Sequence, residues 1–178
     1  MQEIRFHSRG GQGGVTASKL LAQAAFLEGK YSTAFPLYGA ERRGAPITSF
    51  TRISEEDIKI SSQIYQPDIV IVLDDSILDL VNVTDGMKPG GLLIVNTSDL
   101  ARIPKGDFKV AMVNVTDIAL KMGLVLSGNP ILNTPILGAL AGLGIVKLDS
   151  ALAAIKETFS DERNVNAAKE AYEKVVLC

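Results

Sequence analysis

Cysteine and histidine are almost absent from this sequence of 178 residues, which contains one of each. The cysteine is Cys178, the last residue, and the histidine is His7. A single cysteine excludes a disulfide within the chain, and it excludes an iron–sulfur cluster held by this chain alone, because clusters need several thiolates. A zinc site of histidine and cysteine ligands is excluded in the same way. We therefore expect no cofactor or metal to be bound by this chain alone.

Long hydrophobic runs and an excess of one charge are also lacking. The longest apolar stretch, residues 131–146, is too short to span a bilayer and is interrupted by an Asn-Thr-Pro sequence. The first ten residues include no apolar run of signal-peptide length, so we expect a cytoplasmic protein without a membrane partner. Lys and Arg number 18 against 20 Asp and Glu, and this balance argues against nucleic acid as a partner.

Short apolar strands alternate with helical patterns along the chain. Residues 69–73 and 92–95 are continuous apolar runs, typical of strands buried on both faces of a parallel sheet. Further strands are expected at 4–7, 31–35, 47–53, 58–60 and 109–113, and helices at 15–28, 76–81, 117–122, 135–143, 150–159 and 164–176. This order predicts a single α/β domain over residues 1–178, Rossmann-like, with a doubly wound, mostly parallel sheet flanked by helices.

A glycine-rich loop, Gly10-Gly11-Gln12-Gly13-Gly14, separates the first strand from the first helix. Free amides and the helix dipole point the same way in such a loop, so it can bind an anion. The dinucleotide fingerprint fails because Thr16 replaces its third glycine and residues 31–37 contain no acid for the ribose. No Gly-Lys-Ser or Gly-Lys-Thr completes a Walker loop. A tight packing turn and an anion site remain equally open, and Gln12 can face a ligand or a partner chain.

The segment from residue 38 to residue 46 is rich in functional groups. Two arginines near a helix N-terminus can bind a phosphate or carboxylate, and an acid can orient one of them. A solvated turn with an internal Glu–Arg pair is the alternative. The candidate residues are Tyr38, Glu41, Arg42, Arg43 and Gly44.

Two other groups of titratable residues are assigned structural roles. His7 is expected to be a strand-end residue with its hydrogen bonds satisfied, not a catalytic base. Asp74 and Asp75 follow a buried strand and are expected to cap a helix that starts near Ser76, not to act as paired acids or metal ligands.

The two segments together, at this spacing, resemble the gamma subunit family of 2-oxoacid:ferredoxin oxidoreductases. That family shows a glycine loop with a glutamine, then a T-A-x-x-L-x-x-A helix, a Y-G-x-E-x-R-G segment and an arginine-bearing strand. The matching positions are Gly11 to Gly13, Thr16-Ala17, Leu20 or Leu21, Ala24, Tyr38 to Gly44, Pro46, Arg52-Ile53, Pro67-Asp68, the turn 88–91, Asn133, the helix 137–140, and Asn164 or Asn166. The resemblance thus covers nearly the whole chain. Ser8 and Ala40 depart from the glycine and proline that are common in the family.

The resemblance implies a subunit of an enzyme that acts on the oxo group of a 2-oxoacid, with ferredoxin as the iron–sulfur acceptor, and that is inactive alone. It places thiamine diphosphate and iron–sulfur clusters on the alpha, beta and delta partner subunits, with coenzyme A as a substrate. The gamma subunit is left to shape the coenzyme A entrance and the subunit interface. We expect Gly11, Gln12 and Gly13 to approach coenzyme A or the catalytic subunits, with Tyr38, Glu41, Arg42, Arg43 and Gly44 nearby.

Three short segments bear on the substrate. The segments 6–9, 34–36 and 41–43 are closer to the pyruvate or branched-chain versions than to the 2-oxoglutarate or indolepyruvate versions. Pyruvate is therefore favoured. The alternative function is a free-standing nucleotide-binding or regulatory module with a Rossmann-like fold, because fold alone does not fix function.

Overall fold

The computed structural model describes residues 1–37 and 44–178. The elements of this part of the chain are β1 (Gln2–Arg9), α1 (Gly14–Leu27), β2 (Tyr31–Pro36), β3 (Pro46–Ser54), β4 (Ile69–Val72), the 3-10 helix η1 (Asp75–Asp79), β5 (Gly91–Asn96), the 3-10 helix η2 (Leu100–Arg102), β6 (Phe108–Val113), α2 (Val115–Lys121), β7 (Val125–Leu126), β8 (Asn129–Pro130), α3 (Asn133–Gly142), α4 (Leu148–Thr158), α5 (Glu162–Lys174) and β9 (Val176–Leu177).

Seven of the described strands form one mixed sheet in the order β2-β3-β1-β4-β5-β6-β9. Parallel pairing joins β1 to β4, β4 to β5 and β5 to β6. Antiparallel pairing joins β3 to both β1 and β2, and β9 to β6. Five strands therefore run in one direction, with β3 and β9 reversed. The apolar run of β4 is wholly buried at the centre, as its sequence predicts.

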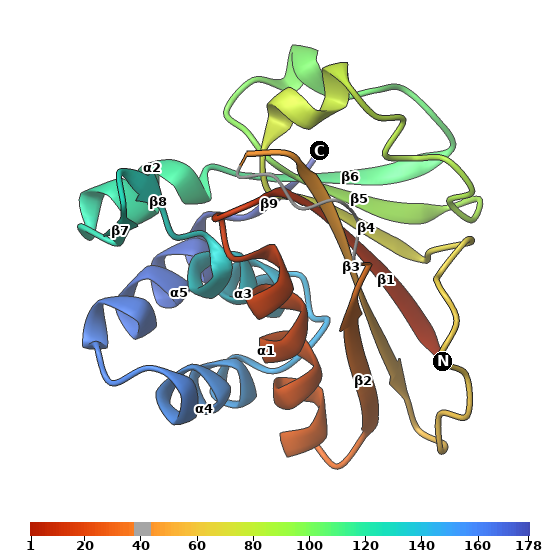
Figure 1. The fold of residues 1–178 in the computed structure, drawn as a ribbon, viewed down its shortest axis with the longest axis horizontal. Coiled ribbons are helices and arrows are strands. Elements are labelled where there is room, and N and C mark those ends of the chain that lie inside the picture. The colour runs from red at the N-terminus through yellow and green to blue at the C-terminus, as the bar shows by residue number, and fades with distance from the viewer. Residues whose placement is uncertain (38–43) are drawn as a thin grey trace.

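The α-helices cover one face of the sheet (Figure 1). Ile4 and Phe6 point from β1 into the core that α1 and α3 form on this face. The helix α3 is buried along nearly its whole length. A smaller apolar cluster on the opposite face lies under η1 and the loop after it, and its buried members are Val70, Val72, Ile77, Val83, Leu93 and Val95. The predicted α/β class, with a mostly parallel sheet flanked by helices, is confirmed.

Two local predictions need correction. The helix expected over 76–81 is the shorter η1, and its N-cap is Asp74, whose carboxylate accepts from the Ser76 amide at 3.0 Å. The strand expected at 58–60 is not formed. The backbone there is held by Arg52 instead of by a neighbouring strand, because its guanidinium donates to the carbonyls of Ile60, at 3.3 Å, and Ser62, at 2.7 Å.

Several other details match their sequence signals. Gly29 follows α1 with φ of 81°, and its amide donates to the Phe26 carbonyl, so it ends the helix in the left-handed conformation expected of a C-terminal glycine. Among the described helices, none combines the length and hydropathy needed to cross a membrane.

Candidate functional site

The glycine loop joins β1 to α1 at the carboxyl end of β1. Gly11 and Gly13 have φ of 92° and 86°, a left-handed conformation that glycine adopts without strain. Gly14 is required for another reason, because a Cβ at this position would lie 2.1 Å from Oγ of Ser8. Gly13 is also the N-cap of α1 and offers no side-chain acceptor. The first amides of α1 are therefore left without a capping side chain.

The helix α3 begins beside the same loop. The Leu132 amide donates to the carbonyl of Gln12 at 3.2 Å, and a Cβ on Gly13 would lie 3.1 Å from the side chain of Asn133. This helix also lacks a side-chain cap. Asn133 is only 5% exposed; its Oδ1 accepts from the Thr134 amide at 2.8 Å. Its Nδ2 has no hydrogen-bond acceptor among the residues that the structure describes.

A pocket of about 360 Å³ opens where the two helix N-termini meet. Ser8 shares a face of β1 with Phe6, which packs in the core beneath the helices, and is paired with Ile47 of β3, so the pocket lies on the face of the sheet that the helices cover. A lining of helix N-terminal residues and apolar side chains suits a ligand with an anionic part and an apolar part. The lining residues are Ser8, Arg9, Gly11, Gly13, Gly14, Val15, Thr16, Ile47, Leu126, Ile131, Asn133 and Phe159.

The side chain of Gln12 is turned into the protein. Its Oε1 accepts from the Arg9 amide at 2.8 Å, and its Nε2 donates to Oδ2 of Asp74 at 2.6 Å. Both ends of the amide are thus engaged within the chain. Gln12 shapes the glycine loop, while Gly11 and Gly13 line the pocket.

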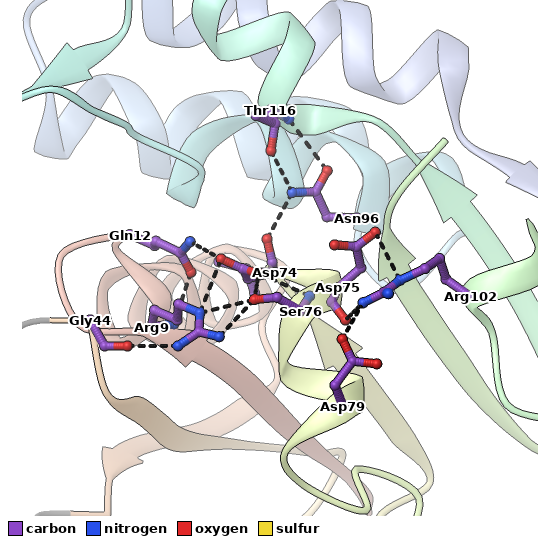
Figure 2. A network of polar contacts seen from close by, with 11 residues as sticks. Arg9, Gln12, Gly44, Asp74, Asp75, Ser76, Asp79, Asn96, Arg102 and Thr116 are labelled. Atoms are coloured by element: carbon purple, nitrogen blue, oxygen red, sulfur yellow. Dashed lines mark hydrogen bonds and ion pairs between the residues drawn. The ribbon is translucent and has the colours of Figure 1, made fainter. Parts of the chain in front are cut away.

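Arg9 is a cationic side chain beside the glycine loop (Figure 2). Its Nε and Nη2 donate to Oγ of Ser76 at 3.0 and 2.7 Å, its Nη1 donates to the Gly44 carbonyl at 2.9 Å, and its Nε lies 3.5 Å from the Asp74 carboxylate. Burial opposes ionisation of Asp74. Hydrogen bonds from Ser76 and Gln12 and the charge of Arg9 outweigh it, so the pKa of Asp74 lies below its usual value.

This network fills the crevice between the carboxyl ends of β1 and β4. The chain leaves β1 toward the β2 edge of the sheet and leaves β4 toward β5, so these strands flank the topological switch point. Open α/β sheets bind their ligands in such crevices. Here the crevice is occupied by Arg9, Gln12 and Asp74, and the space for a ligand lies on the helix side of the glycine loop.

The network continues along the same edge of the sheet (Figure 2). Arg102 of η2 pairs with Asp79 at 2.8 Å and lies 3.8 Å from Asp75. Asn96, at the end of β5, donates to the Leu73 carbonyl at 2.7 Å and to Oγ1 of Thr116 at 2.8 Å. These contacts fix the ends of β4 and β5 and lie away from the pocket.

The second predicted segment is placed only at its end. Tyr38, Glu41, Arg42 and Arg43 lie outside the described residues. Gly44 is described, with φ of 83°, and its carbonyl accepts from Arg9. The described end of this segment therefore contacts Arg9, the last residue of β1 before the glycine loop.

His7 is buried within β1, and it differs from the expectation of a satisfied strand-end residue. Its Nε2 is buried and has no hydrogen-bond partner among the described residues. Burial, and to a lesser degree the charge of Arg5, lower the pKa of His7 to about 4. The imidazole is therefore neutral at pH 7 and is a poor base.

Over residues 1–37 and 44–178, no cluster of three or more His, Cys, Asp or Glu side chains could hold a metal ion. An iron–sulfur cluster does not fit either, because the sequence has one cysteine, which is exposed.

Arg9 and Asp74 were not assigned to the site from the sequence. Each lies at the carboxyl end of a buried strand, and this position was the available signal. Strand-end position alone could not show that Arg9 and Asp74 contact each other, because this contact depends on β1 and β4 being neighbours in the sheet.

Comparison with known proteins fits this fold and this loop. A family described as "Pyruvate ferredoxin/flavodoxin oxidoreductase" matches residues 3–174. The chain is 55% identical to "Pyruvate/ketoisovalerate oxidoreductases common subunit gamma" of Thermococcus litoralis, over 99% of this chain and 98% of the relative. It is 49% identical to "Pyruvate synthase subunit PorC" of Methanothermobacter thermautotrophicus, over 98% and 96%.

A solved structure agrees with these relatives. The crystal structure of pyruvate oxidoreductase subunit PORC of Thermotoga maritima superposes with a TM-score of 0.83 at 37% identity, covering 99% of this chain and 97% of that chain. The similarity thus extends over the glycine loop, the sheet and the helices together. The chain therefore belongs to the pyruvate ferredoxin/flavodoxin oxidoreductase family, among its gamma (PorC) subunits.

Proposed function

We propose that this chain, as a single domain, serves a cytoplasmic 2-oxoacid:ferredoxin oxidoreductase together with alpha, beta and delta subunits. The complex converts a 2-oxoacid, with pyruvate favoured, and coenzyme A to acyl-CoA and CO2, and the electron pair passes to ferredoxin. Thiamine diphosphate and the iron–sulfur clusters are assigned to the partner subunits. The lone cysteine of this chain supports placing the clusters elsewhere, and the word subunit in the names of its relatives supports the existence of partner chains.

The role of this chain is to receive part of coenzyme A in the pocket at the glycine loop. The observation that carries this role is the uncapped N-terminus of α1 at the pocket, together with Nδ2 of Asn133 at the start of α3, which has no hydrogen-bond partner among the described residues. Coenzyme A carries phosphates, which suit helix N-termini, and apolar segments, which suit the wall formed by Ile47, Leu126 and other side chains.

The test is Asn133→Asp in the assembled complex. The substitution keeps the size of the side chain and the acceptor for the Thr134 amide, but it replaces the free amide donor with a negative charge. The KM for coenzyme A is expected to rise about tenfold, while kcat and the KM for the 2-oxoacid stay within about twofold. Steady-state kinetics with ferredoxin or a dye as acceptor measure this difference.

Asn114→Asp is the matched control. Asn114 caps α2 by accepting from the Asp117 amide at 3.0 Å, and it is exposed and absent from the pocket lining. Asn114→Asp adds the same charge away from the pocket, and the KM for coenzyme A is expected to stay unchanged. An unchanged KM in Asn133→Asp would refute the coenzyme A site.

Partners and substrate need a separate experiment. An affinity pull-down of this chain from its native cytoplasm is expected to recover further subunits with thiamine diphosphate, iron and coenzyme A-dependent oxidation of a 2-oxoacid. A panel of 2-oxoacids would then name the substrate. Recovery of the chain alone, colourless and inactive, would contradict the complex and favour a free-standing binding module.

A further inference from the structure

The carboxylate of Asp74 is the centre of the polar network at the switch point. Its Oδ1 accepts from the amide and the hydroxyl of Ser76. Its Oδ2 accepts from Nε2 of Gln12 at 2.6 Å and lies 3.5 Å from Nε of Arg9. Both oxygens of the carboxylate are thus committed to groups of this chain, and Asp74 is not among the pocket residues. Whatever it does for a ligand is done through its neighbours.

Gln12 is the one residue between Gly10 and Gly14 that has a side chain. A run of glycines has unusually high conformational freedom, so its shape must be imposed by contacts. Backbone hydrogen bonds to other segments join the Gly10 amide to the Ala45 carbonyl at 3.0 Å and the Leu132 amide to the Gln12 carbonyl at 3.2 Å, and the Gln12 amide donates to the Arg9 carbonyl at 3.2 Å. The Ser49 hydroxyl donates to the Gly14 carbonyl at 3.2 Å, and the Gln12–Asp74 hydrogen bond adds a side-chain tether from the middle of the loop to the N-cap of η1.

Arg9 extends the same tether to the second family segment. Its guanidinium lies between the Asp74 carboxylate, the Ser76 hydroxyl and the carbonyl of Gly44. The glycine loop and Gly44, the described end of the second segment, are therefore linked to the same carboxylate, the loop through Gln12 and Gly44 through Arg9 (Figure 2).

We propose that Asp74 is a positioning residue for the pocket: it holds the glycine loop, through Gln12 and Arg9, in the shape that aims the N-terminus of α1 at the ligand. This role rests on the proposed binding of coenzyme A at the pocket. Asp74 touches neither the ligand nor the reacting atoms. Its effect belongs to the binding of coenzyme A and not to the chemical step.

Asp74→Asn tests the tether in the assembled complex. The new amide side chain keeps an oxygen to accept from the Ser76 amide, but its Nδ2 then faces Nε2 of Gln12, and two donors cannot bond. Reversing the Gln12 amide does not help, because Nε2 would then face the Arg9 amide. The KM for coenzyme A is expected to rise about tenfold with kcat changed less than about twofold.

The double variant Gln12→Glu, Asp74→Asn should restore binding. The introduced carboxylate accepts from the Arg9 amide with one oxygen and from the introduced amide nitrogen with the other, so the hydrogen bond is remade with donor and acceptor exchanged. A negative charge also stays beside Arg9. The KM for coenzyme A is expected to return to within about twofold of the parent value. A role limited to fold stability would change the amount of active complex and leave the KM for coenzyme A at its parent value in all of these variants.

Gln12→Glu alone gives a further distinct signature. It places two carboxylates within hydrogen-bond distance of each other. Arg9 is the charged group that faces Asp74, while the neighbouring Asp75 carboxylate is turned to Thr97 and Arg102. The two carboxylates repel each other while both are ionised, and a hydrogen bond between them re-forms only when one takes up a proton. The KM for coenzyme A should therefore be raised near neutral pH and fall toward the parent value as the pH is lowered.

Asp79→Asn is the control at the far end of the network, where it removes an exposed pair with Arg102 and should leave the KM for coenzyme A unchanged. An unchanged KM in Asp74→Asn, or a raised KM without rescue in the double variant, overturns the positioning role. The Asn133→Asp result separates the two proposals: a raised KM there with a normal Asp74→Asn leaves the pocket standing and removes only the tether. Normal values in both variants overturn both.

Discussion

At the scale of single residues, Gly14 sets how closely α1 approaches β1. A Cβ at Gly14 would lie 2.1 Å from Oγ and 2.6 Å from Cβ of Ser8. Gly14 has no positive φ, so the barrier to a larger residue is this contact and not the backbone. We expect Gly14→Ala to lower the free energy of unfolding by about 1–3 kcal/mol, as overpacking does. Urea denaturation of the isolated chain measures the loss.

Ser8→Gly in the same chain removes both atoms of the contact. The double variant should therefore be more stable than Gly14→Ala alone, and the two changes should show a favourable coupling energy. Ser8→Ala is the informative control, because it removes Oγ and leaves the Cβ contact. Losses that simply add in the double variant would mean that the overlap is relieved elsewhere.

The residues of the site were partly predictable. The glycine loop and Gly44 were identified because their spacing matches a family pattern. The orientation of Gln12 could not be read from the sequence, because its partner Asp74 is 62 residues away. That contact exists only because β1 and β4 are neighbours, and strand order is a property of the assembled sheet.

At the scale of elements, α3 and α5 pack unusually closely at Gly138. A Cβ on Gly138 would lie 1.9 Å from the carbonyl oxygen of Ala168, which is backbone and cannot rotate away. Glycine to alanine inside a helix normally stabilises a protein by about 1 kcal/mol. Here we expect Gly138→Ala to destabilise by about 1–3 kcal/mol, because α3 must move away from α5.

The sign of the change in unfolding free energy distinguishes overpacking from the gain in helix propensity. Urea denaturation of Gly138→Ala should show a lower midpoint with an unchanged slope if the fold is retained. A higher midpoint would show that the two helices separate without cost and that helix propensity decides the outcome.

Most elements were predicted because their hydrophobic patterns agree with their local surroundings. The helices after residue 130 and the buried strands β4 and β5 are examples. The prediction failed at residues 58–60, where alternating apolar residues resemble a strand. Arg52, which is 1% exposed, engages backbone carbonyls of that segment, and a buried charge needs such acceptors. The local sequence pattern does not show that the backbone carbonyls of this segment will be used by Arg52.

At the scale of the whole molecule, the class of the fold followed from the alternation of strands and helices. Two features of the architecture did not follow. The first is the antiparallel insertion of β3 between β2 and β1, which depends on which strands meet. The second is that the α-helices gather on one face of the sheet, while η1 and the loop after it cover part of the other face. This one-sided cover leaves β1 with Arg5 and His7 buried on the face away from the helices. The imidazole of His7 is buried on that face and has no hydrogen-bond partner among the described residues, so we expect the stability of the molecule to depend on pH.

His7 gives that dependence a definite sign. Its pKa is lowered to about 4 in the folded chain, from about 6.5 when unfolded. Between these values the unfolded state binds a proton that the folded state does not, so folding is favoured as pH rises. The stabilisation is complete above pH 6.5 and is lost as pH falls toward 4, by about 3 kcal/mol in total. His7→Gln cannot titrate, so its unfolding free energy should change much less over this window. Urea denaturation of both chains at several pH values between the two limits checks this, and parallel curves would show that His7 is not the titrating group.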